Sequence, residues 1–155
     1  MLNLLTRVPE QLFRTLPEAL ILLLTRFALA TVFWLSGQTK IEGFAFNPLA
    51  GQFEFGLPTM KESTFFLFEY EYALPLIPAN LAAYLATAAE HVLPILLILG
   101  LFTRLGAAGI LAMTLVIQLF VYPSAYALHT SWAAMALLLM KQGAGRVSLD
   151  NLLTR

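Results

Sequence analysis

The stretch from Asn80 to Phe102 most constrains the fold, because it is long and apolar enough to cross a lipid bilayer. About 20 helical residues at ~1.5 Å each cover a hydrocarbon core of ~30 Å. Glu90 and His91 nevertheless lie in its middle, where a charged side chain costs on the order of 2.5 to 3.5 kcal/mol. We therefore expect them to face the interior of a helix bundle, either in a structural pair or in a site for a ligand, protons or electrons.

The composition supports a membrane protein and excludes several classes of function. Hydrophobic residues make up 59% of the 155 residues and charged residues 12%, against about 25% charged residues in soluble domains. The formal net charge is zero and no nucleic-acid-binding motif is found, which excludes nucleic acid as a partner. The chain has no cysteine, so thiol redox chemistry and thiolate metal ligands are also excluded.

Hydropathy predicts an all-α membrane protein, a single domain over residues 1–155 built as a four-transmembrane-helix bundle. The predicted spans are residues 19–37, 80–102, 104–122 and 125–141. The last is short for a full crossing. Residues 1–18 mix apolar and charged side chains around two prolines, a pattern typical of an amphipathic segment on the membrane surface. A cleavable signal peptide is the alternative, because Ala28-Leu29-Ala30 resembles a cleavage site.

The connection between the first two spans, residues 38–79, is long enough to require structure of its own. Aromatic residues alternate with other residues at 53–55 and at 66–74, and this period of two predicts short strands or extended segments. Several glycines and prolines interrupt the connection, so one long helix is not expected. We predict a structured loop whose aromatic side chains cover one end of the bundle.

The basic residues predict the orientation in the membrane. Six lie in the N-terminal segment, the second loop and the C-terminal tail: Arg7, Arg14, Arg104, Lys141, Arg146 and Arg155. The long first loop has only Lys40 and Lys61. The positive-inside rule therefore places both termini in the cytoplasm and the first loop outside. For a bacterial chain, this predicts a multi-pass protein of the cytoplasmic (inner) membrane.

Counting ~1.5 Å per residue along helices that run alternately up and down gives a depth for each polar side chain. Arg26 and Glu90 each fall near the midpoint of their own predicted span, so the count predicts an intramembrane ion pair between them. A pair of this kind can serve assembly alone, because desolvation offsets most of its attraction. His91 lies about 100° further around the same helix and faces a different direction.

Two more polar residues fall at one depth, displaced toward the first loop. They are Gln118 on the third predicted helix and His129 on the fourth, where His129 shares a face with Trp132. For His129 alone, a hydrogen bond to a neighbouring helix is the simpler explanation. Together with Arg26, Glu90 and His91 these residues predict a polar pocket in an apolar bundle, suited to a small amphipathic ligand such as a quinone.

Three stretches carry a resemblance to a known family. RFALATVFWLSGQTKI at 26–41, AEHVLPILLILGLFTRLGA at 89–107 and GAGRVSLD at 143–150 are similar to the DoxX family of small four-helix bacterial membrane proteins. The resemblance implies a link to membrane redox chemistry, because relatives include the DoxD subunit of a thiosulfate:quinone oxidoreductase and other members associate with oxidative-stress enzymes. Many members have no assigned activity. By position, it singles out Arg26, Lys40 and Glu90.

The sequence leaves two function classes open. In the first, the chain is a quinone-binding subunit that links a partner oxidoreductase to the quinone pool. Glu90 and His91 would handle protons, while the ligand would be bound by a further set: Arg26, Lys40, Gln118, His129 and Trp132. In the second, it is a scaffold or small-molecule carrier without redox activity. Both readings allow a homo-oligomer. A haem held by His91 and His129 is not expected, because their depths differ, and no spacing is diagnostic of a metal site.

Overall fold

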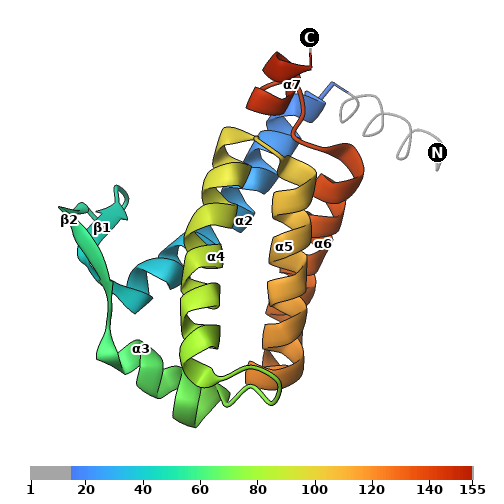
Figure 1. Ribbon diagram of the computed structural model, residues 1–155. Coiled ribbons are helices and arrows are strands. Elements are labelled where there is room, and N and C mark those ends of the chain that lie inside the picture. The colour runs from blue at the N-terminus through green and yellow to red at the C-terminus, as the bar shows by residue number, and fades with distance from the viewer. Residues whose placement is uncertain (1–14, 155) are drawn as a thin grey trace.

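The computed structural model describes residues 15–154, and four long helices form its main body (Figure 1). They are α2 (Glu18–Lys40), α4 (Ala79–Leu99), α5 (Thr103–Val116) and α6 (Tyr126–Gln142), with α5 continued by a π-helical segment, η2 (Ile117–Val121), and a short 3₁₀ turn, η3 (Pro123–Ala125). The amphipathic segment expected at residues 1–18 lies almost entirely outside the described residues.

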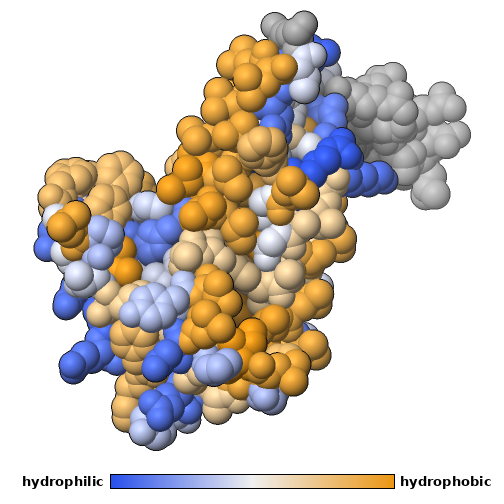
Figure 2. Space-filling view, in the orientation of Figure 1, coloured by the Kyte–Doolittle hydropathy of each residue, from blue (hydrophilic) through white to orange (hydrophobic). Residues whose placement is uncertain are grey.

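Within residues 15–154, three helical segments are long and apolar enough to cross a membrane: Glu18–Lys40, Ala79–Leu99 and Thr103–Val121. The predicted fourth span corresponds to α6. Its 17 residues reach about 26 Å at ~1.5 Å each, so a fourth crossing stays a prediction. Figure 2 shows a broad apolar surface over the helices, as expected for contact with lipid tails.

The connection between α2 and α4 is structured, and it adds a small sheet to the expected all-α fold. Strands β1 (Ile41–Asn47) and β2 (Gln52–Met60) form an antiparallel hairpin that projects from the side of the bundle (Figure 1). The strand predicted at 53–55 is confirmed. The extended segment predicted at 66–74 is wrong, because helix α3 (Glu62–Phe66) and the π-helical segment η1 (Leu67–Tyr72) occupy most of it.

The helical turn explains why alternating aromatics did not form a strand there. The rings of Phe68 and Tyr72 in η1 lie 4.9 Å apart, and the ring of Phe66 at the end of α3 lies 4.6 Å from that of Tyr70. Residues four apart in sequence thus share a face, as on a helix, and Phe68 packs against Ala82 and Ala83 of α4. Packing against the small residues of α4 therefore favours a helical conformation here, although the aromatic residues alternate in the sequence as they would in a strand.

The core of the bundle combines large side chains with small ones. Leu29, Phe33, Leu97, Ile110 and Leu139 are at most 2% exposed, as are Ala30, Ala107 and Ala136. Alanines at such positions let helix backbones approach closely, which is how helices associate in lipid. A last short helix, α7 (Leu149–Leu153), lies across the end that carries the α4–α5 turn (Figure 1). We call this the α7 end and the opposite one the α3 end.

Candidate functional site

A buried ion pair joins the last residue of α2 to the middle of α4. Lys40 Nζ lies 2.7 Å from Glu90 Oε2 and donates a hydrogen bond of 3.0 Å to Glu90 Oε1. Ser36 Oγ donates to the same Oε1 at 3.0 Å and accepts from Lys40 Nζ at 3.0 Å. Lys40 and Glu90 are 5% and 4% exposed. Glu90 therefore has a partner, as expected, but the partner is Lys40.

The predicted pair between Arg26 and Glu90 is wrong because the helices are staggered. Gly37, three residues before the end of α2, packs on the middle of α4: a Cβ added there would lie 3.1 Å from Glu90 Cβ. The depth count assumed that the midpoints of α2 and α4 lie at the same level, and it therefore misplaced α2 along the axis of α4. Arg26 lies 14 residues before Lys40, which is about 21 Å along the helix axis.

The ion pair lies at the wall of a cavity of about 570 Å³ between the helices and η1. Such a volume falls within the range of small-molecule sites. Most of its lining is apolar and comes from α4, α5, α6 and η1. Its polar lining residues are Ser36, Lys40, Tyr72, Glu90, Tyr122, His129 and Trp132. The pocket thus combines apolar walls with a few hydrogen-bonding groups that can orient a ligand.

His129 and Gln118 are brought together, as the depth count predicted. His129 Nδ1 lies 2.7 Å from Gln118 Oε1, and Gln118 Nε2 donates to Pro123 O at 2.8 Å. Because the amide nitrogen is already used as a donor, Oε1 accepts the proton of Nδ1. His129 is 3% exposed and its ring lies 5.0 Å from that of Trp132. In the described part of the chain, Nε2 has no hydrogen-bond partner and remains available to a ligand.

Two tyrosines lie where the pocket reaches the α3 end. Tyr122 Oη donates a 2.7 Å hydrogen bond to Glu71 Oε1, and the rings of Tyr72 and Tyr122 are 5.8 Å apart. The bond to Glu71 raises the pKa of the Tyr122 phenol. Burial first, and then the hydrogen bond with Tyr122, raise the pKa of the Tyr72 phenol. Both phenols stay protonated at neutral pH; Tyr122 gives its proton to Glu71, and Tyr72 gives its proton to Tyr122.

His91 lies outside this cavity and its two ring nitrogens are already bonded. Nδ1 lies 2.7 Å from Thr87 O, and Nε2 lies 3.0 Å from Gln38 Nε2. Gln38 Oε1 in turn accepts the amide proton of Phe46 on β1 at 2.8 Å. His91 therefore ties α4 to the hairpin through Gln38, a structural arrangement that the expected catalytic role did not include.

Arg26 also lies outside the cavity and holds the α7 end together. Its Nη2 donates to Val147 O at 2.6 Å, and the side chain is 1% exposed. Gly100 adopts a positive φ of 65° beside it, and a Cβ on Gly100 would collide with the guanidinium. Arg26 thus packs into the α4–α5 turn and fastens the segment that leads to α7.

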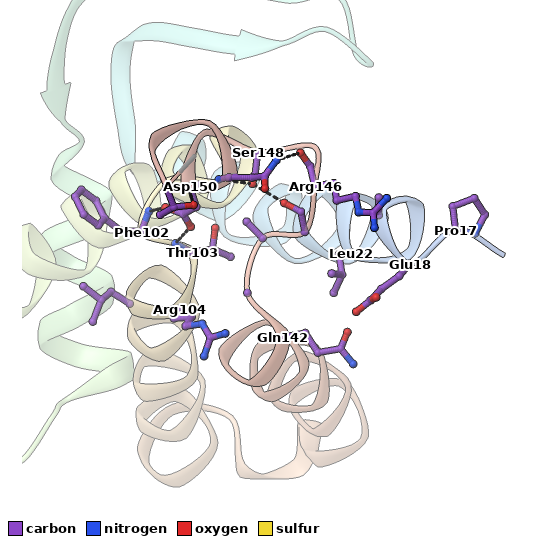
Figure 3. A pocket seen from close by; sticks show the side chains of 17 residues that line it. Pro17, Glu18, Leu22, Phe102, Thr103, Arg104, Gln142, Arg146, Ser148 and Asp150 are labelled. Atoms are coloured by element: carbon purple, nitrogen blue, oxygen red, sulfur yellow. Dashed lines mark hydrogen bonds between the residues drawn. The ribbon is translucent and has the colours of Figure 1, made fainter. Parts of the chain in front are cut away.

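Asp150 also holds the C-terminal segment against the α4–α5 turn. Figure 3 shows it beside a second cavity of about 800 Å³. Its carboxylate accepts the amide protons of Phe102 at 2.8 Å and Thr103 at 3.0 Å, at the start of α5. Burial acts to raise the pKa of Asp150, but these hydrogen bonds and nearby Arg26 together lower it below its ordinary value. Asp150 therefore caps α5 from 47 residues away.

Sequence reasoning missed Ser36 and Tyr72 as members of the pocket. A signal for Ser36 is its position four residues before Lys40, which places both on one face of α2. Tyr72 gave no such signal, because its contact with the pocket depends on η1 folding back onto α4. In the described part of the chain, no three His, Asp or Glu side chains converge as a metal site would require.

Membrane-length helices around a buried ion pair define a multi-pass membrane protein with an internal pocket. The chain belongs to the DoxX family, whose model matches residues 21–123. It is also 30% identical to a protein of Haemophilus influenzae described as uncharacterized, in an alignment that covers 86% of this chain and 83% of that one. No solved structure matches the chain.

Proposed function

We propose that the pocket around Lys40 and Glu90 binds a quinone and that the chain links a partner oxidoreductase to the membrane quinone pool. The observation that carries the proposal is the composition of the cavity. Its apolar walls include Trp132, and its polar groups include Lys40 on α2, His129 on α6 and Tyr122 at the end of η2. A quinone has a flat apolar ring with two carbonyl oxygens, so it needs such walls and donors from more than one side.

The pocket residues divide into donors and proton carriers. Lys40 and the hydroxyl of Tyr72 are the donors, and each would exchange a hydrogen bond within the protein for one to a quinone oxygen. Reduction of a quinone to a quinol takes up two electrons and two protons. The partner subunit supplies the electrons, the protons come from water, and we assign their transfer to the quinone to Glu90 and His129. Neutral His129 presents Nε2 as an acceptor for a quinol hydroxyl, whereas its protonated form donates to a quinone carbonyl.

This assignment differs from the one expected from sequence at several residues, of which Arg26 and His91 change most. Arg26 moves from the ligand to the α7 end, where it bonds Val147. His91 moves from proton transfer to the attachment of the hairpin. Lys40 takes the place of Arg26 as the cation beside Glu90.

Fluorescence of Trp132 tests quinone binding directly, because the chain has only two tryptophans and Trp34 does not line the cavity. In Trp34→Phe protein in nanodiscs, a short-chain quinone should quench Trp132 emission to a saturating level. The matched Trp132→Phe variant, which keeps Trp34, should show only weak quenching that rises in proportion to the quinone added. Equal, non-saturating quenching in both variants would contradict binding in the pocket.

The same titration separates the quinone function from a carrier without redox activity. A hydrophobic phenol or long-chain alcohol that competes as well as an unlabelled quinone would favour a general carrier, because such ligands lack paired carbonyls. Competition limited to quinones would favour the redox-linked function. Electron transfer to the bound quinone is then measured with the oxidoreductase that co-purifies from native membranes.

A further inference from the structure

The contact between α4 and α5 is tight near the turn that joins these helices. A Cβ on Gly106 would lie 3.4 Å from Leu97 Cδ2. A Cβ on Gly109 would lie 2.9 Å from Leu93 Cδ1, so a larger residue would collide there. The two glycines therefore let the helices pack closely, and Leu97 is 0% exposed. Lipid does not reach between α4 and α5 at this level.

Farther from the turn the two helices part, and the cavity that contains the ion pair lies between them. One turn from the tight contact, Ala89 on α4 and Ala112 on α5 both line this cavity. A turn further on, Leu85 and Val116 line it as well. Leu85 is 55% exposed and Val116 40% exposed, and Ala112 is also exposed. Figure 1 shows α4 and α5 diverging toward the α3 end. Because these side chains line the cavity and are also exposed, the cavity opens between α4 and α5.

This opening lies in the middle of two membrane-length helices. Ala89 is the central residue of α4 (Ala79–Leu99), and Ala112 is the central residue of the span Thr103–Val121. A short turn joins the two spans, so their relative depth does not depend on the stagger of α2. The rim of the opening consists of alanine, leucine and valine side chains. The opening therefore faces lipid tails.

The polar groups of the cavity are more deeply buried than this rim. Lys40, Glu90 and His129 are 5%, 4% and 3% exposed. An amphipathic molecule fits such an arrangement, because its polar head can contact the buried groups while a hydrocarbon chain passes through the apolar rim. A water-soluble ligand would have to leave water for the hydrocarbon region to reach the same opening, which costs free energy for every polar group that it carries.

We propose that the ligand of this cavity is a lipid-dissolved molecule that enters sideways between α4 and α5, and that its hydrocarbon tail lies between Ala89 and Ala112. The proposal rests on the proposed function for the identity of the head group, a quinone, but not for the opening or the tail. Larger side chains at residues 89 and 112 should obstruct the opening, because both residues lie at its rim.

Brominated lipid tests the opening without any quinone. In Trp34→Phe protein, Trp132 in the cavity wall is the only tryptophan, and bromine quenches tryptophan emission only at close range. In nanodiscs of phosphatidylcholine brominated in the middle of its acyl chains, we expect strong quenching of Trp132. Ala112→Phe should reduce this quenching several-fold. The matched control Ala88→Phe should not, since Ala88 is exposed on α4 but does not line the cavity.

Ala89→Phe repeats the test from the other side of the opening, in case the new ring at residue 112 turns away from it. Equal quenching in Ala112→Phe, Ala89→Phe and Ala88→Phe protein would overturn the proposal, because bromine would then reach Trp132 by another route. Absence of quenching in all of these proteins would also overturn it, since the cavity would be closed to lipid.

Quinones with and without a long tail test the placement of the tail. Both should quench Trp132 to saturation in Trp34→Phe protein. Ala112→Phe should weaken binding of the long-tailed quinone several-fold more than binding of the head group alone, because only the tail occupies the opening. Equal affinity of Ala112→Phe and Ala88→Phe protein for the long-tailed quinone would keep the quinone function and overturn the tail placement. If no quinone saturates the quenching but Ala112→Phe still reduces quenching by brominated lipid, the quinone function fails and the opening to lipid stands.

Discussion

Lys40 Nζ lies 2.7 Å from Glu90 Oε2, although the two residues are 50 positions apart in the chain. The contact joins the end of α2 to the middle of α4 and sets the stagger between these helices. It also places a cation and an anion at the wall of the cavity. The same pair therefore serves both the fold and the proposed ligand site.

Removing one partner of this pair should destabilise the protein strongly. Lys40→Gln and Glu90→Gln each leave a buried charge without its counter-ion, which typically costs about 3 to 5 kcal/mol. The double variant Lys40→Met/Glu90→Leu should recover most of this loss, because apolar side chains of similar volume replace the charges. Thermal unfolding in detergent, followed by intrinsic fluorescence, measures both effects.

Glu62→Gln is the matched control for these variants, since Glu62 is exposed in the first turn of α3. It should leave the unfolding temperature almost unchanged. Single variants as stable as this control would show that the ion pair does not hold α2 against α4. A recovered double variant that still bound quinone with wild-type affinity would remove Lys40 and Glu90 from the ligand site.

Substitutions of His129 and His91 should have different effects on quinone binding and on the stability of the hairpin. His129→Leu removes a side chain that lines the cavity and should weaken quinone binding, whereas His91→Leu should not, because His91 lies outside the cavity. His91→Leu should instead loosen the hairpin by breaking its link to Gln38, a loss of about 1 kcal/mol. Binding titrations and amide hydrogen exchange at residues 44–47 distinguish the outcomes; weaker binding in His91→Leu alone would reverse the assignment.

The cap formed by Asp150 should make stability depend on pH. Its pKa is lowered in the folded protein, so its contribution is fully present above the unfolded value of about 3.9 and is lost as the pH falls through the folded value. Asp150→Asn should cost about 1 kcal/mol at neutral pH. The difference in unfolding temperature between wild type and variant should shrink below about pH 4; a constant difference down to pH 3 would contradict the cap.

The orientation of the chain in the membrane is a further prediction. Alkaline phosphatase fused at Gly51, in the turn between β1 and β2, should be active outside the cytoplasm, since six basic residues lie in the N-terminal segment, the second loop and the C-terminal tail and only two in this connection. Green fluorescent protein fused after Arg155 should fluoresce. An inactive phosphatase at Gly51 together with a fluorescent reporter after Arg155 would place both positions in the cytoplasm. The chain would then cross the membrane an odd number of times, and α6 would not span it.

Sequence could predict the helices and part of the site, but not their stagger. Apolar runs located α2, α4, α5 and α6 to within a few residues, since lipid imposes length and hydropathy on each span. Gln118 and His129 were brought together correctly because α5 and α6 are joined by a short turn, which fixes their relative depth. Lys40 and Glu90 are separated by the whole connection 41–78, so no local rule fixed the depth of α2 against α4.

Photoaffinity labelling tests the central proposal most directly, namely that a quinone occupies the cavity beside Lys40 and Glu90. The purified protein in nanodiscs is illuminated with an azidoquinone, digested, and mapped by mass spectrometry. We predict labels on cavity residues such as Tyr72, Met113 and Trp132, and their loss when excess unlabelled quinone is present. Labels spread over lipid-facing residues such as Leu24 and Leu119, with no effect of the competitor, would contradict a quinone site in this pocket.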